Sequence, residues 1–182
     1  DGKALQSGTS HNFGDGFAKA FGIQYAAKDN TLQYVHQTSW GMSSRIIGAI
    51  IMTHGDNNGL VLPPAVAPVQ VVILPIAMHK EGVLDKAMEL RDRLAATFRV
   101  KVDDSDNSAG WKFAEYEMKG VPLRLEIGPK DIANNQCVLV RRDNREKTFV
   151  SLDQLEAAIA EQLEAVRAGL YEKALARREE MT

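Results

Sequence analysis

The sequence predicts an α/β protein, because strands and helices alternate from residue 69 onward. Residues 69–76, VQVVILPI, form a continuous apolar run that is typical of a strand covered on both faces. Residues 84–98 repeat apolar side chains at helical spacing, and residues 121–128, VPLRLEIG, alternate as a strand does. Strands that alternate with helices are typical of a mainly parallel or mixed sheet flanked by helices.

Fewer elements are expected before residue 69. The opening stretch, DGKALQSGTSHNFGDG, is polar, rich in glycine and without a period. Residues 31–40 alternate with a period of two and predict one strand. After the break at GMSS, Ser43 or Ser44 can cap a helix that continues through the apolar residues 46–52. A stiff connector and a domain boundary are then predicted by three prolines: Pro63, Pro64 and Pro68.

The remaining elements complete the predicted sheet and its helices. A short strand is expected at residues 99–104, and a helix between Ser108, as its N-terminal cap, and Gly120. Residues 136–151 predict a hairpin that turns at residues 143–144. A long final helix is indicated by apolar residues at helical spacing: Leu152, Leu155, Ile159, Leu163, Val166 and Leu170.

The composition excludes several classes of protein. The chain has 182 residues, is 45% hydrophobic and 25% charged, and carries a net charge of −2, which is ordinary for a soluble globular protein. Its single cysteine, Cys137, cannot form an internal disulfide, and no His/Cys cluster predicts zinc or another metal site, so a reducing, cytosolic compartment is expected. No apolar run reaches a membrane span, and the polar start is not a signal peptide. The charge argues against non-specific DNA or RNA binding but not against a local site.

Arg45 is the first candidate functional residue. It stands in the otherwise small and apolar stretch QTSWGMSSRIIGAI, which we expect to be buried, and a buried guanidinium is costly without an anionic partner. Two interpretations remain open. Arg45 and the amino terminus of the helix together can bind an anion, usually phosphate, or Arg45 pairs with a carboxylate elsewhere in the fold.

A second candidate is the stretch from residue 111 to residue 147, where cations and aromatic side chains gather. Unpaired RNA loops are bound by stacking on aromatic side chains and by hydrogen bonds to base edges. A solvated surface is the alternative, and it is favoured on these residues alone, because Lys and Arg on helices and hairpins usually face water. The side chains are Trp111, Lys112, Phe113, Tyr116, Lys119, Arg124, Lys130, Arg141, Arg142, Arg145 and Lys147.

Three long motifs carry a resemblance to a known family. They are QSGTSHNFG, QTSWGMSSRIIGAIIMTHGDNNGLVLPP and GWKFAEYEMKGVPLRLEIGPKDI, and they resemble prolyl-tRNA synthetases of the archaeal and eukaryotic-like type. The resemblance covers nearly the whole chain. For residues 1–67 it implies a partial class II synthetase catalytic domain, with an antiparallel sheet and the strand and helix of motif 3. It implies an anticodon-binding domain with a mixed sheet flanked by helices for residues 68–165, and a helical linker toward a further domain for residues 166–182.

The resemblance implies a role for Arg45 and its surroundings. The strand, turn and helix there resemble class II motif 3, whose arginine binds the γ-phosphate of ATP and neutralises the departing pyrophosphate as the catalytic residue. The implied ATP-binding residues are Gln6, Thr9, Ser43 and Arg45, and the implied proline-binding residues are His11, Trp40 and Gly41. The implied reaction converts L-proline and ATP, accompanied by Mg²⁺, to prolyl-adenylate and then transfers the prolyl group to tRNA(Pro).

Three residues of the second part match the family positions that read the two guanines of a proline anticodon: Glu117, Arg124 and Lys130. The chemistry suits guanine. A carboxylate can accept hydrogen bonds from guanine N1–H and N2–H₂, and Arg or Lys can donate to O6 and N7.

The chain lacks the class II motifs 1 and 2, so we expect a fragment of a cytoplasmic homodimeric synthetase that cannot activate proline by itself. A free-standing tRNA-binding module without catalysis is the alternative. Five residues occurring together argue against it: Gln6, Thr9, His11, Ser43 and Arg45. A synthetase for threonine, glycine or histidine is disfavoured by the stretches TSWG and GWKF.

Overall fold

The computed structural model of the chain describes residues 4–180. The chain divides into two compact units, unit 1 from Asp1 to Ile50 and unit 2 from Ile51 to Thr182. The division precedes the proline-rich connector because that connector is bonded to unit 2, where the Leu60 N–H donates to the Met118 carbonyl at 2.9 Å. The boundary expected at residue 67 stays a prediction.

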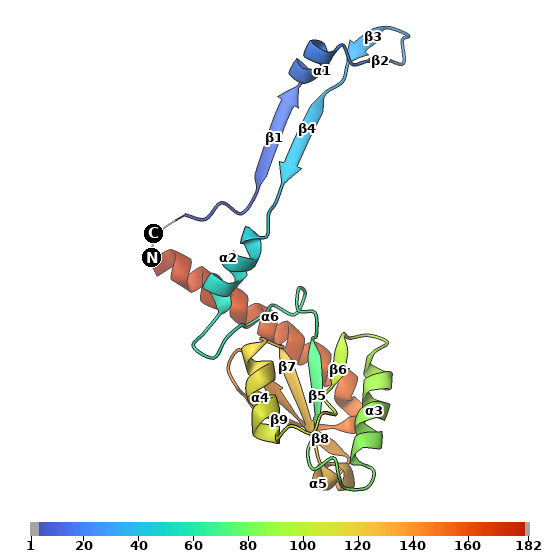
Figure 1. Ribbon diagram of the computed structural model, residues 1–182, viewed down its shortest axis with the longest axis vertical. Helices are drawn as coiled ribbons and strands as arrows, with labels where there is room; N and C mark the ends of the chain where they lie inside the picture. Colours follow the sequence, from blue (N-terminus) through green and yellow to red (C-terminus); the bar gives the residue numbers. More distant parts are fainter. Residues whose placement is uncertain (1–3, 181–182) are drawn as a thin grey trace. The chain divides into compact units, whose positions relative to one another are not determined.

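Residues 4–44 of unit 1 form two two-stranded antiparallel sheets and a short helix (Figure 1). β1 (Thr9–Gly14) pairs with β4 (Gln37–Gly41) in antiparallel register. Between them, β2 (Gln24–Ala26) pairs with β3 (Leu32–Tyr34). The helix α1 (Gly16–Phe21) follows β1 directly.

Two expectations for this region are wrong. Residues 31–40 do not form one strand, because β3 pairs with β2 and β4 pairs with β1, and residues 35–36 belong to neither strand. The helix α2 (Arg45–His54) forms where it is expected, but it buries none of its side chains. Unit 1 has no core that could cover it, since Ala18 is the only buried residue among residues 4–50.

Unit 2 contains one five-stranded mixed sheet with the strand order β6-β5-β7-β8-β9. β5 (Val71–Pro75) lies between two parallel neighbours, β6 (Val100–Val102) and β7 (Leu123–Ile127). β8 (Gln136–Arg141) runs antiparallel to β7 and continues as a hairpin into β9 (Lys147–Ser151). All five strands lie within the stretches that the sequence predicts as strands, which confirms the mixed sheet.

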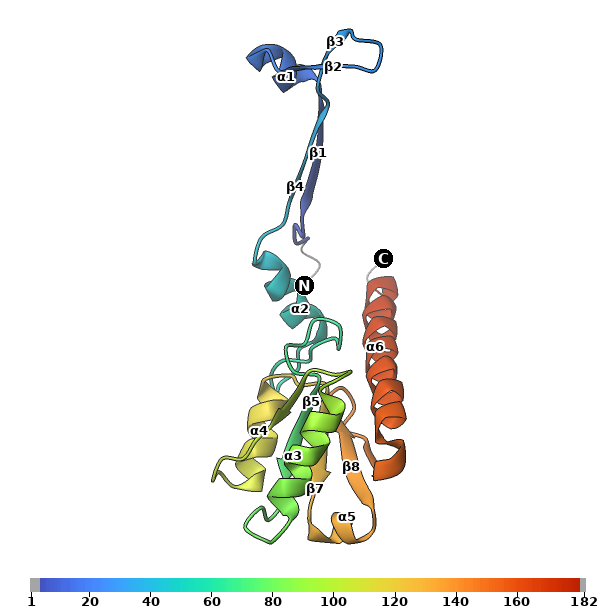
Figure 2. The same cartoon turned by 90° about the vertical axis from the view of Figure 1, so that its right-hand side faces the viewer.

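Helices pack on both faces of this sheet (Figures 1 and 2). α3 (Val83–Leu94) and α6 (Leu155–Glu180) pack on one face and enclose the main hydrophobic core. α4 (Ala109–Met118) packs on the other face over β5, and α5 (Pro129–Ala133) connects β7 to β8. On the face that α4 shares, no other helix among residues 4–180 packs over β8 or β9.

A single residue determines where α4 begins, and another determines where it ends. The Ser108 hydroxyl accepts a hydrogen bond from the Trp111 N–H at 3.3 Å, as expected for the N-terminal cap. Gly120 ends the helix with a φ of 71°. A side chain at Gly120 would lie 2.7 Å from Leu60, and one at Gly59 would lie 2.5 Å from the Met118 carbonyl, so both positions require glycine for close backbone contact.

α6 contributes a continuous row of buried side chains to the core: Leu155, Ile159, Leu163, Val166 and Leu170. These are the positions that the helical spacing predicts. The row extends beyond residue 165, so the helix stays packed against the sheet into the segment that is expected to be a linker.

Truncation of Ile159 to alanine should lower the free energy of unfolding of unit 2 by about 2–5 kcal/mol, because the side chain is fully buried in the main core and its removal leaves a cavity. Urea unfolding followed by circular dichroism measures this. Glu161→Ala, on the exposed side of the same helix, is the matched control and should change the free energy by less than about 0.5 kcal/mol. Equal effects of the two substitutions would contradict the packing of α6.

Candidate functional site

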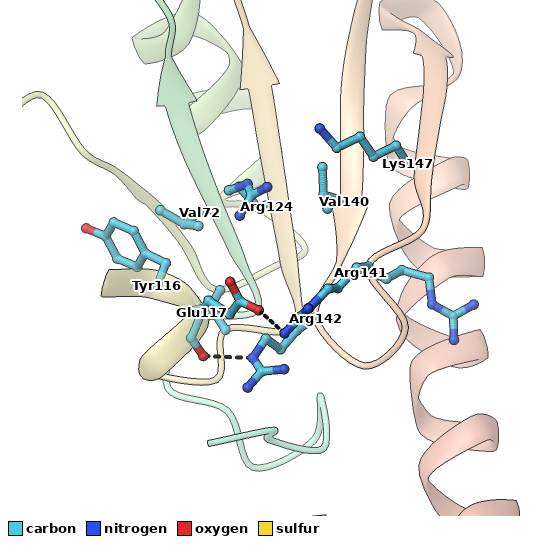
Figure 3. Close-up of a pocket in the computed structure, with 10 residues that line it drawn as sticks. Val72, Tyr116, Glu117, Arg124, Val140, Arg141, Arg142 and Lys147 are labelled. Carbon is cyan, nitrogen blue, oxygen red and sulfur yellow. Dashed lines mark hydrogen bonds and ion pairs between the residues drawn. The ribbon is translucent and has the colours of Figure 1, made fainter. Parts of the chain in front are cut away.

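A pocket opens in unit 2 where α4 ends beside the uncovered part of the sheet (Figure 3). Four side chains cross this face in register, one from each of β5, β7, β8 and β9: Val72, Arg124, Val140 and Lys147. The pocket is also lined by residues from α4, the loop after it and the turn between β8 and β9: Tyr116, Glu117, Val121, Arg141, Arg142 and Arg145.

Arg124 is held in the pocket on two sides. Its guanidinium lies over the Phe113 ring, 4.2 Å from the ring centroid, and its Nε donates to Glu126 Oε1 at 2.8 Å. The first contact is a cation–π interaction and the second is an ion pair on the same strand. Neither Nη atom donates a hydrogen bond to any residue in the range 4–180, so both are available to a ligand.

Glu117 faces Arg124 from the last turn of α4. Its Oε1 lies 2.8 Å from an Nη of Arg145. That contact is an ion pair by distance, but the angle is not that of a hydrogen bond, and Oε1 is buried without a hydrogen-bond donor from the described residues. A buried carboxylate oxygen without a donor is unfavourable. A ligand N–H that reaches it would remove this cost.

Arg142 joins three segments beneath the pocket. It is 5% exposed, and its two Nη atoms donate to the two carboxylate oxygens of Asp56 at 2.8 and 2.7 Å. Its Nε donates to the Glu117 backbone carbonyl at 2.7 Å, a contact drawn in Figure 3. The fork geometry is the strong form of an Arg–carboxylate pair. The guanidinium holds the pKa of the Asp56 carboxyl well below its usual range.

The structure separates the cations that the sequence groups together. Lys112 is buried and donates to the Asp103 carbonyl at 3.0 Å. Arg141 turns away from the pocket toward α6 and pairs with Asp143 at 2.7 Å (Figure 3). Lys112 and Arg142 are buried and Arg141 is half-buried, so the solvated-surface interpretation is wrong for these three residues.

The structure brings only two of the three predicted anticodon residues together. Glu117 and Arg124 line the same pocket. Lys130 is exposed on α5, which follows the carboxyl end of β7, whereas Arg124 lies near the start of that strand. Lys130 does not line the pocket.

The predicted ATP-binding residues meet in unit 1. Gln6, Thr9, Ser43 and Arg45 line one hollow together with Gly41. Arg45 Nη1 donates to Gln6 Oε1 at 3.3 Å, and the Arg45 N–H lies 3.4 Å from the Ser43 hydroxyl that accepts from it. Arg45 is exposed, and no carboxylate pairs with it among residues 4–180, so its charge is free to meet an anion.

The predicted proline-binding residues lie on the same pair of strands, β1 and β4, but not on one face. Thr9 pairs with Gly41 and His11 with Ser39, whereas Trp40 pairs with Ser10. Side chains alternate along a strand, so His11 and Trp40 project to opposite faces of the ribbon. Trp40 is 82% exposed.

Metal-binding clusters and membrane-spanning helices are absent from residues 4–180. No group of three or more His, Cys, Asp or Glu side chains is close enough to hold a metal ion. None of the helices in that range is long and apolar enough to cross a membrane.

Comparison with known proteins identifies the class of unit 2. The model of the anticodon binding domain family matches residues 70–162, which span the sheet and its helices. The chain belongs to the anticodon binding domain family.

The whole chain is similar to proline–tRNA ligases. It is 70% identical to that of Ruminiclostridium cellulolyticum, 68% to that of Clostridium novyi and 63% to that of Oceanobacillus iheyensis, in each case over its entire length. It spans 38% of the length of each of these relatives. The resemblance to prolyl-tRNA synthetases that the motifs indicate is thereby confirmed.

Replacing Asp56 with asparagine should destabilise unit 2 by about 1–2 kcal/mol at neutral pH, since it weakens the pair with Arg142 while the Asp56 side chain, 37% exposed, is partly screened by water. Because folding lowers the pKa of Asp56, its contribution is complete above the unfolded value of about 4 and fades as the pH falls further. The gap in stability between wild type and Asp56→Asn should therefore narrow between pH 5 and pH 2.

Denaturant unfolding at a series of pH values measures the gap. Asp104→Asn is the matched control, because Asp104 is exposed and makes no ion pair within residues 4–180. A gap for Asp56→Asn that stays constant with pH would show that its charge does not stabilise the fold.

Proposed function

We propose that unit 2 reads the anticodon of tRNA(Pro) as part of a proline–tRNA ligase. One observation supports this most directly. Glu117 offers a buried carboxylate oxygen without a donor, and Arg124 offers two unused Nη groups, in one pocket on an open sheet face. Membership of the anticodon binding domain family supplies the ligand class.

The two side chains present the complement of a guanine edge. Glu117 accepts from N1–H and N2–H₂, and Arg124 donates to O6 or N7. Stacking on Phe113 holds the planar Arg124 guanidinium in one orientation, so little side-chain entropy is lost when a base binds. Lys130 is proposed as a separate contact, to the second guanine or to the backbone next to it, because it lies away from the pocket.

Binding of the chain to a proline anticodon stem-loop should be about 5- to 150-fold tighter than binding to a loop with both guanines replaced by adenines, which is the worth of one bidentate base contact. Glu117→Ala or Arg124→Ala should remove most of that preference. Fluorescence anisotropy at fixed salt measures it.

Lys119→Ala is the matched control, because Lys119 is exposed at the end of the same helix and pairs with Glu115. It should weaken both loops equally, as the loss of a charge near phosphates does. If Glu117→Ala and Arg124→Ala keep the guanine preference of the wild type, neither residue recognises guanine.

We further propose that the whole protein activates L-proline with ATP and Mg²⁺ and esterifies tRNA(Pro), as a cytoplasmic homodimer. The name shared by its relatives and the hollow in unit 1 support this. Arg45 would bind the γ-phosphate and neutralise the departing pyrophosphate, with Gln6, Thr9 and Ser43 around the nucleotide. This catalysis depends on positioning and charge, so no proton transfer by Arg45 is required.

His11, Trp40 and Gly41 are proposed as proline-binding residues in the whole protein. Because His11 and Trp40 leave the ribbon on opposite faces, only His11 shares a face with Thr9 and Gly41. We therefore propose His11 as the residue that contacts proline directly and Trp40 as a wall that packs against other parts of the protein.

A chimera tests the role of Arg45 in the whole protein. This chain should replace the corresponding 38% of the Ruminiclostridium cellulolyticum ligase and retain proline-dependent ATP–pyrophosphate exchange. Arg45→Ala in the chimera should lower kcat/KM for ATP about 100-fold or more, because a charge at the departing phosphates is lost. The exposed Lys28→Ala should leave exchange unchanged. An active Arg45→Ala chimera would exclude the catalytic role.

A further inference from the structure

One aromatic side chain on the uncovered part of the sheet has no role in the guanine contacts described above. Phe149, in the middle of β9, is 68% exposed, whereas the next residue, Val150, is buried in the main core. Alternation along the strand therefore directs the Phe149 ring to the face that carries the pocket. An aromatic ring in a regular strand that no helix covers is free to meet a flat partner.

The strand register places Phe149 beside the cations of that face. Phe149 pairs with Val138, and Val138 pairs with Glu126. This row runs next to the row that contains Arg124 and Lys147, and Lys147 lies two residues from Phe149 on the same strand. By this register the Phe149 ring adjoins Lys147, which lines the pocket.

The charges of this surface favour an anionic partner. The negative charges of its two carboxylates are offset by arginines, since Glu126 pairs with Arg124 and Glu117 lies 2.8 Å from Arg145. Lys147 has no acidic partner among residues 4–180. An unpaired cation beside an exposed aromatic ring is the combination that binds single-stranded nucleic acid, in which the ring stacks on a base and the cation meets a phosphate.

A protein partner fits this surface less well. The centre of a protein–protein interface is apolar and depleted of charged residues. Here Phe149 and the half-buried Val138 are flanked by Glu126 and Lys147, so the apolar area is narrow and bordered by charge.

We propose that Phe149 is a stacking platform for one unpaired base of the RNA loop whose guanines enter the pocket, and that Lys147 binds a phosphate beside that base. The proposal rests on the proposed function of unit 2 and adds a contact that does not depend on guanine. Stacking tolerates any base, so Phe149 contributes affinity and orientation, while Glu117 and Arg124 contribute the discrimination between bases.

The test measures binding of the chain to the proline anticodon stem-loop and to loops in which one unpaired nucleotide at a time is abasic. Phe149→Ala should weaken the intact loop about 5- to 150-fold, the range found for loss of one base–aromatic stack. Phe149→Trp should bind as the wild type does. At one position, removal of the base should weaken binding of the wild type by the same factor as Phe149→Ala does. Phe149→Ala should not weaken binding to that abasic loop any further.

Tyr171→Ala is the matched control, because Tyr171 is an exposed aromatic residue on α6, which covers the opposite face of the sheet. It should leave binding unchanged. The guanine preference of Phe149→Ala, measured with the loop whose guanines are replaced, should equal that of the wild type.

The outcomes separate this proposal from the function on which it rests. Wild-type affinity of Phe149→Ala for every loop would overturn the stacking role, and guanine preference in the wild type would still support anticodon reading. If Phe149→Ala lowers the affinity for every abasic loop by the same factor, stacking on one particular base would also be overturned. Failure of the wild type to bind any stem-loop would overturn both proposals.

Discussion

The pocket of unit 2 depends on one buried guanidinium. Arg142 binds the Asp56 carboxylate and the Glu117 carbonyl at once, and so it ties the loop after α2 and the end of α4 to the turn after β8. The same carbonyl, in the last turn of α4, also accepts a hydrogen bond from the Gly120 N–H at 3.1 Å. The glycines at 59 and 120 allow the backbones to meet closely there. The position of the Glu117 carboxylate is a consequence of these contacts.

The proposed function of this sheet face requires that part of it stays exposed to solvent. α4 is 10 residues long and packs over β5, and on that face Arg124 and Val138 are half-buried while Lys147 and Phe149 are exposed. At the pocket Glu126 pairs with Arg124 and Glu117 with Arg145, while neither Nη atom of Arg124 donates a hydrogen bond to any residue in the range 4–180. A surface of this kind holds fixed hydrogen-bonding groups next to stacking surfaces, which is what an unpaired RNA loop requires.

Much of unit 2 could be predicted from local patterns. The strands of the sheet, the cap at Ser108 and the buried row of α6 all lie where apolar spacing and turn residues indicate. Unit 1 was less predictable, because alternation over residues 31–40 does not reveal that its two halves pair with different strands. The apolar residues after Arg45 suggested burial, but burial needs neighbours, and residues 4–50 contain only one buried side chain.

The sequence by itself determined the secondary structure of unit 2, its mixed sheet and its family, because periodicity, caps and long motifs are properties of neighbouring residues. Only the tertiary structure decided which cations face a ligand. Arg142 pairs with Asp56 across a separation of 86 residues, and the sequence around either residue does not predict this pair. Lys112 and Arg142 are buried and Arg141 is held by Asp143, whereas strand register leaves Arg124, Lys147 and the Phe149 ring on the open face. Contacts between segments that are distant in the sequence decide whether each of these side chains is buried or exposed. Local sequence patterns do not encode such contacts.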